Sequence, residues 1–225
     1  MNAVALLLAA GRGERLDRGG AKGLVELGGR PLLAHSVDAV EACGAIEAFV
    51  VAAPAGGEDR AKVAAARSAK LLAVATGGET RQASVRTALA AVPETFDAVV
   101  CHDVARPFAP PELFERVLRA LGDAAGVVPA IPIPDTAKRV EEGVVVETIA
   151  RERVVAAQTP QAFRRQALED AHAAADRDGV VATDDAALLE RAGFRVVTVP
   201  GDPVNRKITV PDDLVWAEAV LRERG

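Results

Sequence analysis

The sequence has little of what several classes of protein require. Its two cysteines, Cys43 and Cys101, stand far apart and in no pattern typical of a metal or redox site. No apolar run approaches the length of a membrane span, and no basic region precedes the short apolar stretch at the N-terminus. Positive charge is not in excess, because 27 Lys and Arg stand against 32 Asp and Glu, a net charge of −5. Since nucleic-acid binding usually needs a basic domain, we expect no nucleic-acid partner. From the lack of a membrane span and of a signal segment we expect a cytoplasmic protein that binds no membrane.

Familiar catalytic signatures are missing too. The chain shows no nucleophile elbow, no set of zinc ligands, and no serine, histidine and aspartate in the arrangement of a catalytic triad. What it offers is 225 residues, half of them hydrophobic, which suffice to bury the core of one large α/β domain.

Apolar runs alternate with amphipathic stretches along most of the chain. This alternation predicts an α/β fold in one domain over residues 1–225, with a Rossmann-like, mostly parallel sheet and helices on both faces. The expected strands are Ala3–Ala9, Ile46–Ala53, Lys70–Ala75, Ala98–Cys101, Gly126–Ile131 and Arg195–Val199. The expected helices are Pro31–Ala42, Glu58–Arg67, Thr80–Ala91, Pro111–Leu121, Arg164–Asp176, Thr183–Ala192 and Pro211–Arg224. Ligands of such sheets bind beside the carboxyl ends of the strands. The loops expected around the site are those after Ala9, Ala75, Cys101 and Ile131.

One stretch, Pro132–Gln161, breaks the alternation. It holds two β-branched runs, Val144–Ile149 and Val154–Val155, with turn residues at Glu142 and Gly143, and it has no helical period. Two interpretations remain open. The stretch is either a hairpin-like β-arm that protrudes from the main sheet or a long meander packed on the domain.

The strongest functional signal lies between Leu6 and Leu27, in the segment LLLAAGRGERLDRGGAKGLVEL. A buried strand ends at Ala10 and Gly11, and a glycine-rich loop follows. Backbone N–H groups in such a loop can cradle phosphates, and its small residues let the backbone approach a ligand closely. Four side chains of the loop supply positive charge for a polyanion: Arg12, Arg15, Arg18 and Lys22. The segment therefore predicts a nucleoside triphosphate site, and the plain alternative is an arginine-rich surface loop.

Two known phosphate-binding loops do not match this one. The dinucleotide fingerprint needs a third glycine where this chain has Leu16, so that helix and strand can pack closely. A P-loop needs a Gly-Lys step followed by a hydroxyl that binds magnesium, and neither is present around Lys22. The loop is therefore of a third kind.

Two more loops at strand ends hold candidate residues. Asp103 is well placed to hold Mg²⁺, which prefers oxygen ligands, or else it caps a turn. Arg106 can bind a phosphate bidentately or buttress its loop. In the other loop Gly78 allows close backbone approach, Thr80 is expected to cap the next helix, and Ser84 faces the loop side one helical turn later.

Two late segments are polar. Thr183 is a natural N-cap for the helix that follows it. Asn205–Thr209 is expected to be a short polar strand, which places Lys207 shortly before the last helix. By pattern alone, Lys207 is a solvated surface lysine.

Together these segments resemble one family, the 2-C-methyl-D-erythritol 4-phosphate cytidylyltransferases, which are nucleotidyltransferases of the non-mevalonate isoprenoid pathway. The same motifs occur there in the same order and spacing: LAAGRGERL with Lys22, GGETRQASV, HDVARP, DTAKR, TPQAF, TDDA and RKIT-x-PDDL. The chain departs from the family where Ala21 and Gly23 replace the usual Pro and Gln, and where Val104 replaces alanine.

The resemblance implies a reaction, a set of roles and an assembly. CMP passes from CTP to 2-C-methyl-D-erythritol 4-phosphate, a polyol phosphate, by Mg²⁺-assisted in-line attack, and pyrophosphate leaves. The implied catalytic cations are Arg15, Lys22 and Lys207, and the implied nucleotide-binding residues are Ala9, Ala10, Gly11, Gly78 and Ser84. The residues implied at the phosphosugar are Asp103, which also positions Mg²⁺, Arg106, Thr136, Arg151, Thr159 and Thr183. In the family the arm interlocks two subunits and lends residues to the neighbour's site, which implies a homodimer.

Two alternatives stay open. One is a related nucleotidyltransferase with another acceptor, such as ribitol 5-phosphate, or with another nucleotide. The other is a non-catalytic nucleotide-binding module. The presence of both Lys22 and Lys207 favours an enzyme, because binding alone does not need cations on both sides of the reacting phosphorus.

Overall fold

The computed structural model describes residues 1–11, 13–16 and 21–224. Two cations expected in the first loop, Arg12 and Arg18, lie outside these ranges. The strands are β1 (Ala3–Leu8), β2 (Glu26–Leu27), β3 (Arg30–Pro31), β4 (Ala48–Ala53), β5 (Leu71–Thr76), β6 (Ala98–Asp103), β7 (Gly126–Pro132), β8 (Lys138–Glu141), β9 (Val144–Thr148), β10 (Val155–Ala157), β11 (Gln161–Arg164) and β12 (Val196–Pro200). The helices are α1 (Leu32–Ala42), α2 (Glu58–Ala65), α3 (Arg81–Ala90), α4 (Pro111–Ala120), α5 (Arg165–Asp178), α6 (Asp185–Arg191) and α7 (Pro211–Arg224), with short 3-10 helices η1 (Glu14–Leu16), η2 (Lys22–Leu24) and η3 (Arg151–Arg153).

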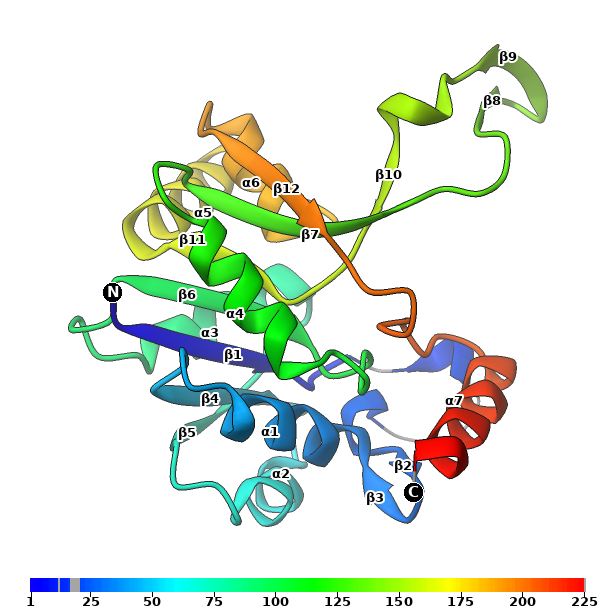
Figure 1. Ribbon diagram of the computed structural model, residues 1–225. Helices are drawn as coiled ribbons and strands as arrows, with labels where there is room; N and C mark the ends of the chain where they lie inside the picture. The colour runs from blue at the N-terminus through cyan, green and yellow to red at the C-terminus, as the bar shows by residue number, and fades with distance from the viewer. Residues whose placement is uncertain (12, 17–20, 225) are drawn as a thin grey trace.

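An eight-stranded sheet forms the centre of the molecule (Figure 1). Its strand order is β10-β7-β11-β6-β1-β4-β5, and β12 also pairs with β7. Strand β1 lies parallel to both β4 and β6, β4 to β5, and β7 to β12. Only the short strands β10 and β11 run antiparallel to their neighbours in this sheet. The predicted Rossmann-like, mostly parallel sheet is confirmed.

Strand β1 shows why its sequence is apolar throughout. All six of its residues are buried, because helices cover both faces of the sheet. Its odd-numbered residues, such as Ala5 and Leu7, share a hydrophobic cluster with residues of α1, α2 and α4. Its even-numbered residues, such as Val4 and Leu6, share another with residues of α3, α5 and α6. Because side chains alternate along a strand, β1 contributes residues to both hydrophobic clusters.

Two local expectations about the ends of helices have different outcomes. Thr80 caps α3 as predicted, because its hydroxyl accepts a hydrogen bond from the Ala83 N–H at 3.0 Å. Thr183 does not cap α6. Asp184 does so, since its carboxylate accepts from the Ala187 N–H at 3.0 Å and the helix begins one residue later.

The expected strand Asn205–Thr209 is wrong. These residues form no strand, because their backbone groups bond to turns and loops rather than to a neighbouring strand. Asn205 N–H donates to the Asp202 carbonyl at 3.0 Å, and Ile208 N–H donates to the Ala105 carbonyl at 2.8 Å. The segment is therefore tied to the loop after β6.

The stretch after β7 contains a protruding arm, as one of its two interpretations held. Strands β8 and β9 form a separate two-stranded hairpin whose residues are all exposed, and Figure 1 shows it extending away from the main sheet. At the base of the hairpin, Ile149 N–H donates to the Ala137 carbonyl at 2.9 Å. The arm is shorter than Pro132–Gln161, because β10 pairs with β7 and Gln161 begins β11 in the main sheet.

A third hydrophobic cluster joins the first loop to the C-terminal helix. It contains Leu16, Leu27, Leu32, Phe108, Ile208, Leu214 and Ala217. Because it combines residues of η1, the β2–β3 hairpin and α7, it packs the C-terminal helix against the segment that follows β1. Among the described residues, no helix has both the length and the apolar character needed to cross a membrane.

Candidate active site

A cavity of about 900 Å³ opens at the carboxyl ends of β1, β4, β5 and β6. The predicted site residues that line it are Ala9, Ala10, Gly11, Arg15, Lys22, Gly78, Ser84, Asp103 and Lys207. The rule for parallel sheets thus predicted the edge of the sheet at which this cavity lies. One expected loop differs: the described lining includes Pro54 and Ala55 after β4, and it does not include the loop after Ile131.

The glycine-rich loop returns to its own starting point. The N–H of Lys22 donates to the carbonyl of Gly11 at 2.9 Å, so Lys22 lies beside the end of β1. Gly23 then lies directly against Ala9, where an added Cβ would stand 2.7 Å from the Ala9 Cβ and 2.8 Å from its Cα. No larger residue therefore fits at position 23 of this structure unless the backbone shifts.

Lys22 is a cation held in an unfavourable place. Burial lowers its pKa to about 8, and the positive charges of Lys207 and Arg15 act in the same direction. Asp103 opposes this effect only in part. A group of cations around a cavity, with too few carboxylates to neutralise them, is the electrostatic arrangement that a polyanion satisfies.

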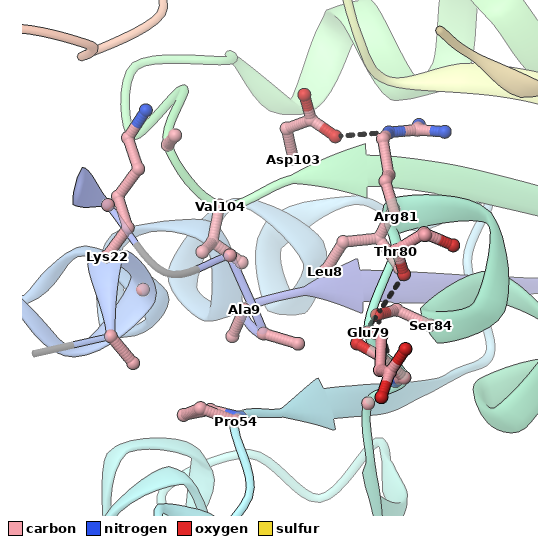
Figure 2. A pocket seen from close by; sticks show the side chains of 18 of the residues that line it. Leu8, Ala9, Lys22, Pro54, Glu79, Thr80, Arg81, Ser84, Asp103 and Val104 are labelled. Atoms are coloured by element: carbon pink, nitrogen blue, oxygen red, sulfur yellow. Dashed lines mark hydrogen bonds and ion pairs between the residues drawn. The ribbon is translucent and has the colours of Figure 1, made fainter. Parts of the chain in front are cut away.

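The turn between β5 and α3 is built for close approach. Gly77 N–H donates to the Ala53 carbonyl at 2.7 Å, and an added Cβ at Gly77 would lie 2.3 Å from the Ala10 Cβ. The Ser84 hydroxyl accepts from Gly78 N–H at 3.2 Å and donates to the Thr80 carbonyl at 2.9 Å. Figure 2 shows this turn and Lys22 on opposite sides of the view, with Ala9 between them.

Asp103 is the central carboxylate of the cavity. Its Oδ1 accepts from Arg81 Nε at 3.0 Å, and its Oδ2 accepts from Lys207 Nζ at 2.6 Å. Burial alone would raise the pKa of this carboxyl, but the charges of the two cations and their hydrogen bonds hold it well below its usual range. Asp103 is therefore an anion at every physiological pH.

Backbone contacts from distant segments fix the loop of Asp103. The Asp103 N–H donates to the Thr159 hydroxyl at 3.0 Å. The side-chain amide of Asn205, which is fully buried, donates to the Thr159 carbonyl at 2.8 Å. The polar residue types of the late segment thus serve to hold it beside the loop after β6, and this brings Lys207 to Asp103.

The side chains of Arg106 and His102 make contacts within the protein that stabilise the fold. The Arg106 guanidinium donates to the Asn205 carbonyl at 2.8 Å and to the Ala157 carbonyl at 3.2 Å, which is the buttressing arrangement considered from the sequence. His102 is completely buried, its ring lies 5.1 Å from that of Phe114, and burial lowers its pKa to about 3. A neutral, enclosed imidazole cannot act as a base in the cavity.

Three predicted residues lie away from this cavity. Thr136 stands before β8 and Arg151 in η3, both exposed and near the base of the arm, and Thr183 is exposed before α6. None of them is among the described residues that line the cavity, and neither are Arg106 and Thr159. A single chain therefore brings together the residues predicted for the nucleotide and leaves most of those predicted for the phosphosugar outside.

Sequence reasoning missed Arg81 as a site residue. Its guanidinium lines the cavity and bridges Asp103 to Asp185, with Nη1 2.7 Å from the Asp185 Oδ2 (Figure 2 shows the Asp103 contact). Its place in GGETRQASV, one residue after the helix cap, was visible. Its two partners were not, because they lie 22 and 104 residues further along the chain.

The cavity offers few side-chain ligands for a divalent cation. Among the described residues, no group of three or more His, Cys, Asp or Glu gathers to hold a metal ion. The carboxylates on the cavity are those of Asp103 and Glu79. This set fits a magnesium ion that takes most of its ligands from nucleotide phosphates and water and at most one or two from the protein. Asp103 can offer Oδ2 to such an ion once Lys207 turns away.

Comparisons with known proteins agree with the geometry. A family model for IspD, 2-C-methyl-D-erythritol 4-phosphate cytidylyltransferase, matches residues 3–223. The enzyme of that name from Thermosynechococcus vestitus is 45% identical over 225 residues, covering 97% of this chain and 95% of the relative. A bifunctional IspD/IspF enzyme of Nitratidesulfovibrio vulgaris is 46% identical over 224 residues, and there the match spans only 57% of the relative.

Solved structures give the same result. The chain is similar to the 2-C-methyl-D-erythritol 4-phosphate cytidylyltransferase of Thermus thermophilus, with 37% identity, a TM-score of 0.82 and coverage of 99% and 100% of the two chains. It is also similar to the 4-diphosphocytidyl-2C-methyl-D-erythritol synthase of Anaerococcus prevotii, with 30% identity, a TM-score of 0.88 and coverage of 98% and 96%. The resemblance found in the motifs thus extends over the whole fold, and the chain belongs to the 2-C-methyl-D-erythritol 4-phosphate cytidylyltransferase family of nucleotidyltransferases.

Proposed function

We propose that this protein transfers CMP from CTP to 2-C-methyl-D-erythritol 4-phosphate and releases pyrophosphate. One observation carries the proposal: the fold brings Lys22 from the first loop and Lys207 from the segment before the last helix to the cavity that Asp103 also lines. Both lysines belong to motifs of the family to which the chain belongs. Binding a nucleotide alone would not need cations from both ends of the chain.

The nucleotide lies along the edge formed by the first loop and the turn after β5. Backbone N–H groups near Ala9, Ala10 and Gly11 receive the phosphates, with Arg15 and Lys22 as cations. The base and ribose lie against Gly78, whose position Ser84 fixes by a hydrogen bond. Binding the triphosphate stabilises the charged form of Lys22, because an anion favours the protonated amine.

The chemistry is an in-line displacement. An oxygen of the acceptor phosphate attacks the α-phosphorus of CTP and forms a new P–O bond, while the bond from that phosphorus to the bridging oxygen breaks. Pyrophosphate leaves with the electron pair of that bond. The attacking oxygen is already anionic, so the protein needs neither a nucleophile nor a general base. Its task is to hold two anions together and to stabilise the charge of the transition state, which is the role of Arg15, Lys22 and Lys207.

Asp103 serves the reaction by its charge and position. We assign to it an oxygen ligand for Mg²⁺ and a place beside the acceptor. When bound, Mg²⁺ neutralises phosphate charge and orients the triphosphate. Lys207, now paired with Asp103, is within reach of either the carboxylate or a phosphate, and we infer that it turns toward the phosphate when substrate binds.

The acceptor pocket needs a second copy of the chain. Thr136 and Arg151, which flank the hairpin, are exposed and lie outside the described lining of the cavity of their own chain. The hairpin exposes the pair Val140 and Val145 on one face and Val144 and Val146 on the other. Exposed apolar side chains gathered on one element favour an interface. We propose a homodimer in which each arm completes the partner's acceptor pocket, together with Thr183 and with the loop that Arg106 and Thr159 hold. A cytoplasmic location is part of the same proposal, since both substrates are metabolites.

The test is release of pyrophosphate with a panel of substrates. CTP should be turned over far faster than UTP, ATP or GTP, because a site that hydrogen-bonds one base leaves its polar groups unpaired with another. Among acceptors, 2-C-methyl-D-erythritol 4-phosphate should exceed ribitol 5-phosphate and other polyol phosphates in kcat/KM. Equal rates with several nucleotides, or a clear preference for another acceptor, would point to the alternative transferases. CTP binding without turnover of any acceptor would point to a binding module.

A further inference from the structure

Three consecutive residues of the TDDA motif have three different environments. Thr183 is exposed to solvent. Asp184 caps α6 and also accepts a hydrogen bond from the side-chain amide of Gln161 at 2.9 Å. Asp185 is buried, with only 1% of its side chain exposed, and its carboxylate lies between Arg81 and His172. A buried carboxylate at the first turn of a short helix is more than that helix requires, because Asp184 already caps it.

Asp185 determines which part of the Arg81 guanidinium reaches the cavity. Arg81 gives Nη1 to Asp185 at 2.7 Å and Nε to Asp103 at 3.0 Å. Its third nitrogen, Nη2, is buried and has no hydrogen-bond partner among the described residues. The guanidinium is a rigid plane, so the two carboxylates together fix its orientation.

His172 holds Asp185 from the other side. Its Nε2 lies 2.9 Å from the Asp185 Oδ1, and both side chains are almost fully buried. A carboxylate only accepts hydrogen bonds, so the Nε2 carries the proton and donates. A chain of three contacts therefore runs from α5 to the cavity: His172 to Asp185, Asp185 to Arg81, and Arg81 to Asp103.

The contact with Asp185 affects what Asp103 can do. An arginine paired with a single carboxylate tends to bind both of its oxygens through two parallel N–H groups. Here Asp185 holds Nη1 and so fixes the orientation of the guanidinium. In this orientation Arg81 reaches Asp103 through Nε and Oδ1 alone, and the neighbouring Nη2 stays unpaired among the described residues. The Oδ2 of Asp103 stays available for Lys207, and through it for the substrates.

We propose that Asp185 and His172 are positioning residues for the transferase reaction, which act on Asp103 through Arg81. They touch neither the cavity nor, on the proposed function, the substrates. They divide the Arg81 guanidinium between two carboxylates and so leave one oxygen of Asp103 free to act. The inference rests on the proposed function for its kinetic readout, and its structural readout does not depend on it.

The kinetic test is a double-mutant cycle. Asp185→Asn keeps the shape of the side chain and removes its charge, and it should lower kcat by about 10-fold or more, as displacement of a reacting group does. The KM for CTP should change by less than about 3-fold, because Arg15 and Lys22 are untouched. In an Arg81→Met background, Asp185→Asn should cause no further loss, since its effect passes through Arg81. Additive losses in the cycle, or a kcat within 2-fold of wild type, would overturn the proposal.

A matched control comes from the same pair of helices. Asp178 of α5 pairs with Arg191 of α6 at 3.3 Å, and both side chains are about half exposed. Asp178→Asn removes a carboxylate that pairs between the same two helices and makes no ion pair with Arg81, and it should leave kcat and KM unchanged. A loss of kcat in this variant equal to that of Asp185→Asn would mean that any weakening of the α5–α6 contact is enough, and the proposal would be wrong.

Two variants of His172 decide the case if Asp185→Asn does not fold. His172→Gln keeps an N–H donor near the Asp185 carboxylate and should retain most of the kcat, whereas His172→Leu removes the donor and should lose it. Equal kcat values for the two variants would contradict the proposal.

Crystal structures separate this inference from the proposed reaction. In Asp185→Asn, or in His172→Leu, Arg81 should turn so that Asp103 binds it through both oxygens. An unchanged Arg81 would refute the positioning role even if the protein proved to catalyse another reaction. Wild-type protein that releases no pyrophosphate would instead refute the proposed function and leave the structural comparison valid.

Discussion

Lys207 Nζ lies 2.6 Å from Oδ2 of Asp103, across 104 residues of sequence. The lysine therefore covers the oxygen of Asp103 that Arg81 does not hold. Its side chain is 41% exposed, so it is free to leave that oxygen when a phosphate competes for it. The contact makes Lys207 part of the site in this structure, whereas its sequence pattern alone indicates a surface lysine.

Replacing Lys207 should therefore affect catalysis far more than folding. Lys207→Ala should lower kcat by about 10²-fold or more, the usual consequence of losing one preorganised charge at a reacting phosphate. The midpoint of thermal unfolding should change little, because the half-exposed ion pair contributes about 1 kcal/mol at most. Steady-state kinetics and a thermal melt measure both quantities. Lys62→Ala on α2 removes another exposed, ion-paired lysine and is the control. A Lys207→Ala protein with wild-type kcat would leave the mechanism to Arg15, Lys22 and Asp103.

Lys22 should limit the reaction at high pH. Burial lowers its pKa to about 8 in the free protein, so the amine is charged below this pH and neutral above it. If the charge is needed to bind the triphosphate, kcat/KM for CTP should fall about 10-fold per pH unit above 8, since that parameter follows the free enzyme. Lys22→Arg should remove this fall, because an arginine stays protonated throughout. A profile that is flat up to pH 10 in the wild type would contradict the assignment.

The same lysine should lower the stability of the ligand-free protein. Its pKa is lower in the folded chain than the ordinary value of 10.5, so the unfolded chain binds more protons between about pH 8 and 10.5. Stability should therefore rise with pH across this window. Lys22→Met should unfold at a higher temperature than wild type at pH 7 while losing activity. A lower unfolding temperature for Lys22→Met would mean that Lys22 stabilises the folded protein, contrary to this prediction.

The sequence predicted the parts of the fold that depend on local pattern. Apolar runs with helices between them gave the parallel strands, and Thr80 gave the start of α3. It did not predict β11, because four residues that begin with a buried glutamine have no alternation to recognise. It also misjudged Thr183, since Asp184 and Thr183 are both good caps and only tertiary contacts choose between them.

The site shows the same division. Residues in loops at strand ends were expected to lie around one cavity, and they do, because the rule for parallel sheets places such loops together. Arg81 was missed because its role comes from Asp103 and Asp185, two partners that no local pattern connects to it. Long-range ion pairs leave no periodic signal in one sequence. They need the fold, or the motifs of a family, to be seen.

Gly23 should not tolerate a side chain in this protein. A Cβ there would meet the backbone of Ala9 at 2.8 to 2.9 Å, closer than real contacts allow. Gly23→Ala should therefore lower the free energy of unfolding by about 1–3 kcal/mol, as overpacking does, and weaken CTP binding by shifting Lys22. Gly44→Ala, where a Cβ meets nothing within 4 Å, is the control. Denaturant melts and a CTP titration measure the two effects, and wild-type values for Gly23→Ala would show that the loop can move aside.

Shortening the arm should separate the subunits. Ala137 and Ile149 are joined by a backbone hydrogen bond at the base of the hairpin, so residues 138–148 can be replaced by a two-residue turn without disturbing the sheet. The shortened protein should be monomeric by light scattering at micromolar concentration, with an unfolding temperature set by the intact core. Its activity should be low, because the arms no longer meet the partner's pocket. An active monomer would contradict a shared site.

Complementation between two inactive variants tests the shared site most directly. Lys22→Ala disables the cavity of its own chain, and Arg151→Ala disables the arm. If each arm serves the partner's cavity, a mixed dimer has one site with an intact cavity and an intact arm. Random mixing of two such subunits makes half of the dimers mixed, so coexpression should restore about a quarter of wild-type activity. If Arg151 serves its own chain, every site in the mixture carries one defect, and nothing is restored. Coexpression of Lys22→Ala with Lys207→Ala is the control, since both changes lie in the cavity and every site of that mixture stays defective in either arrangement.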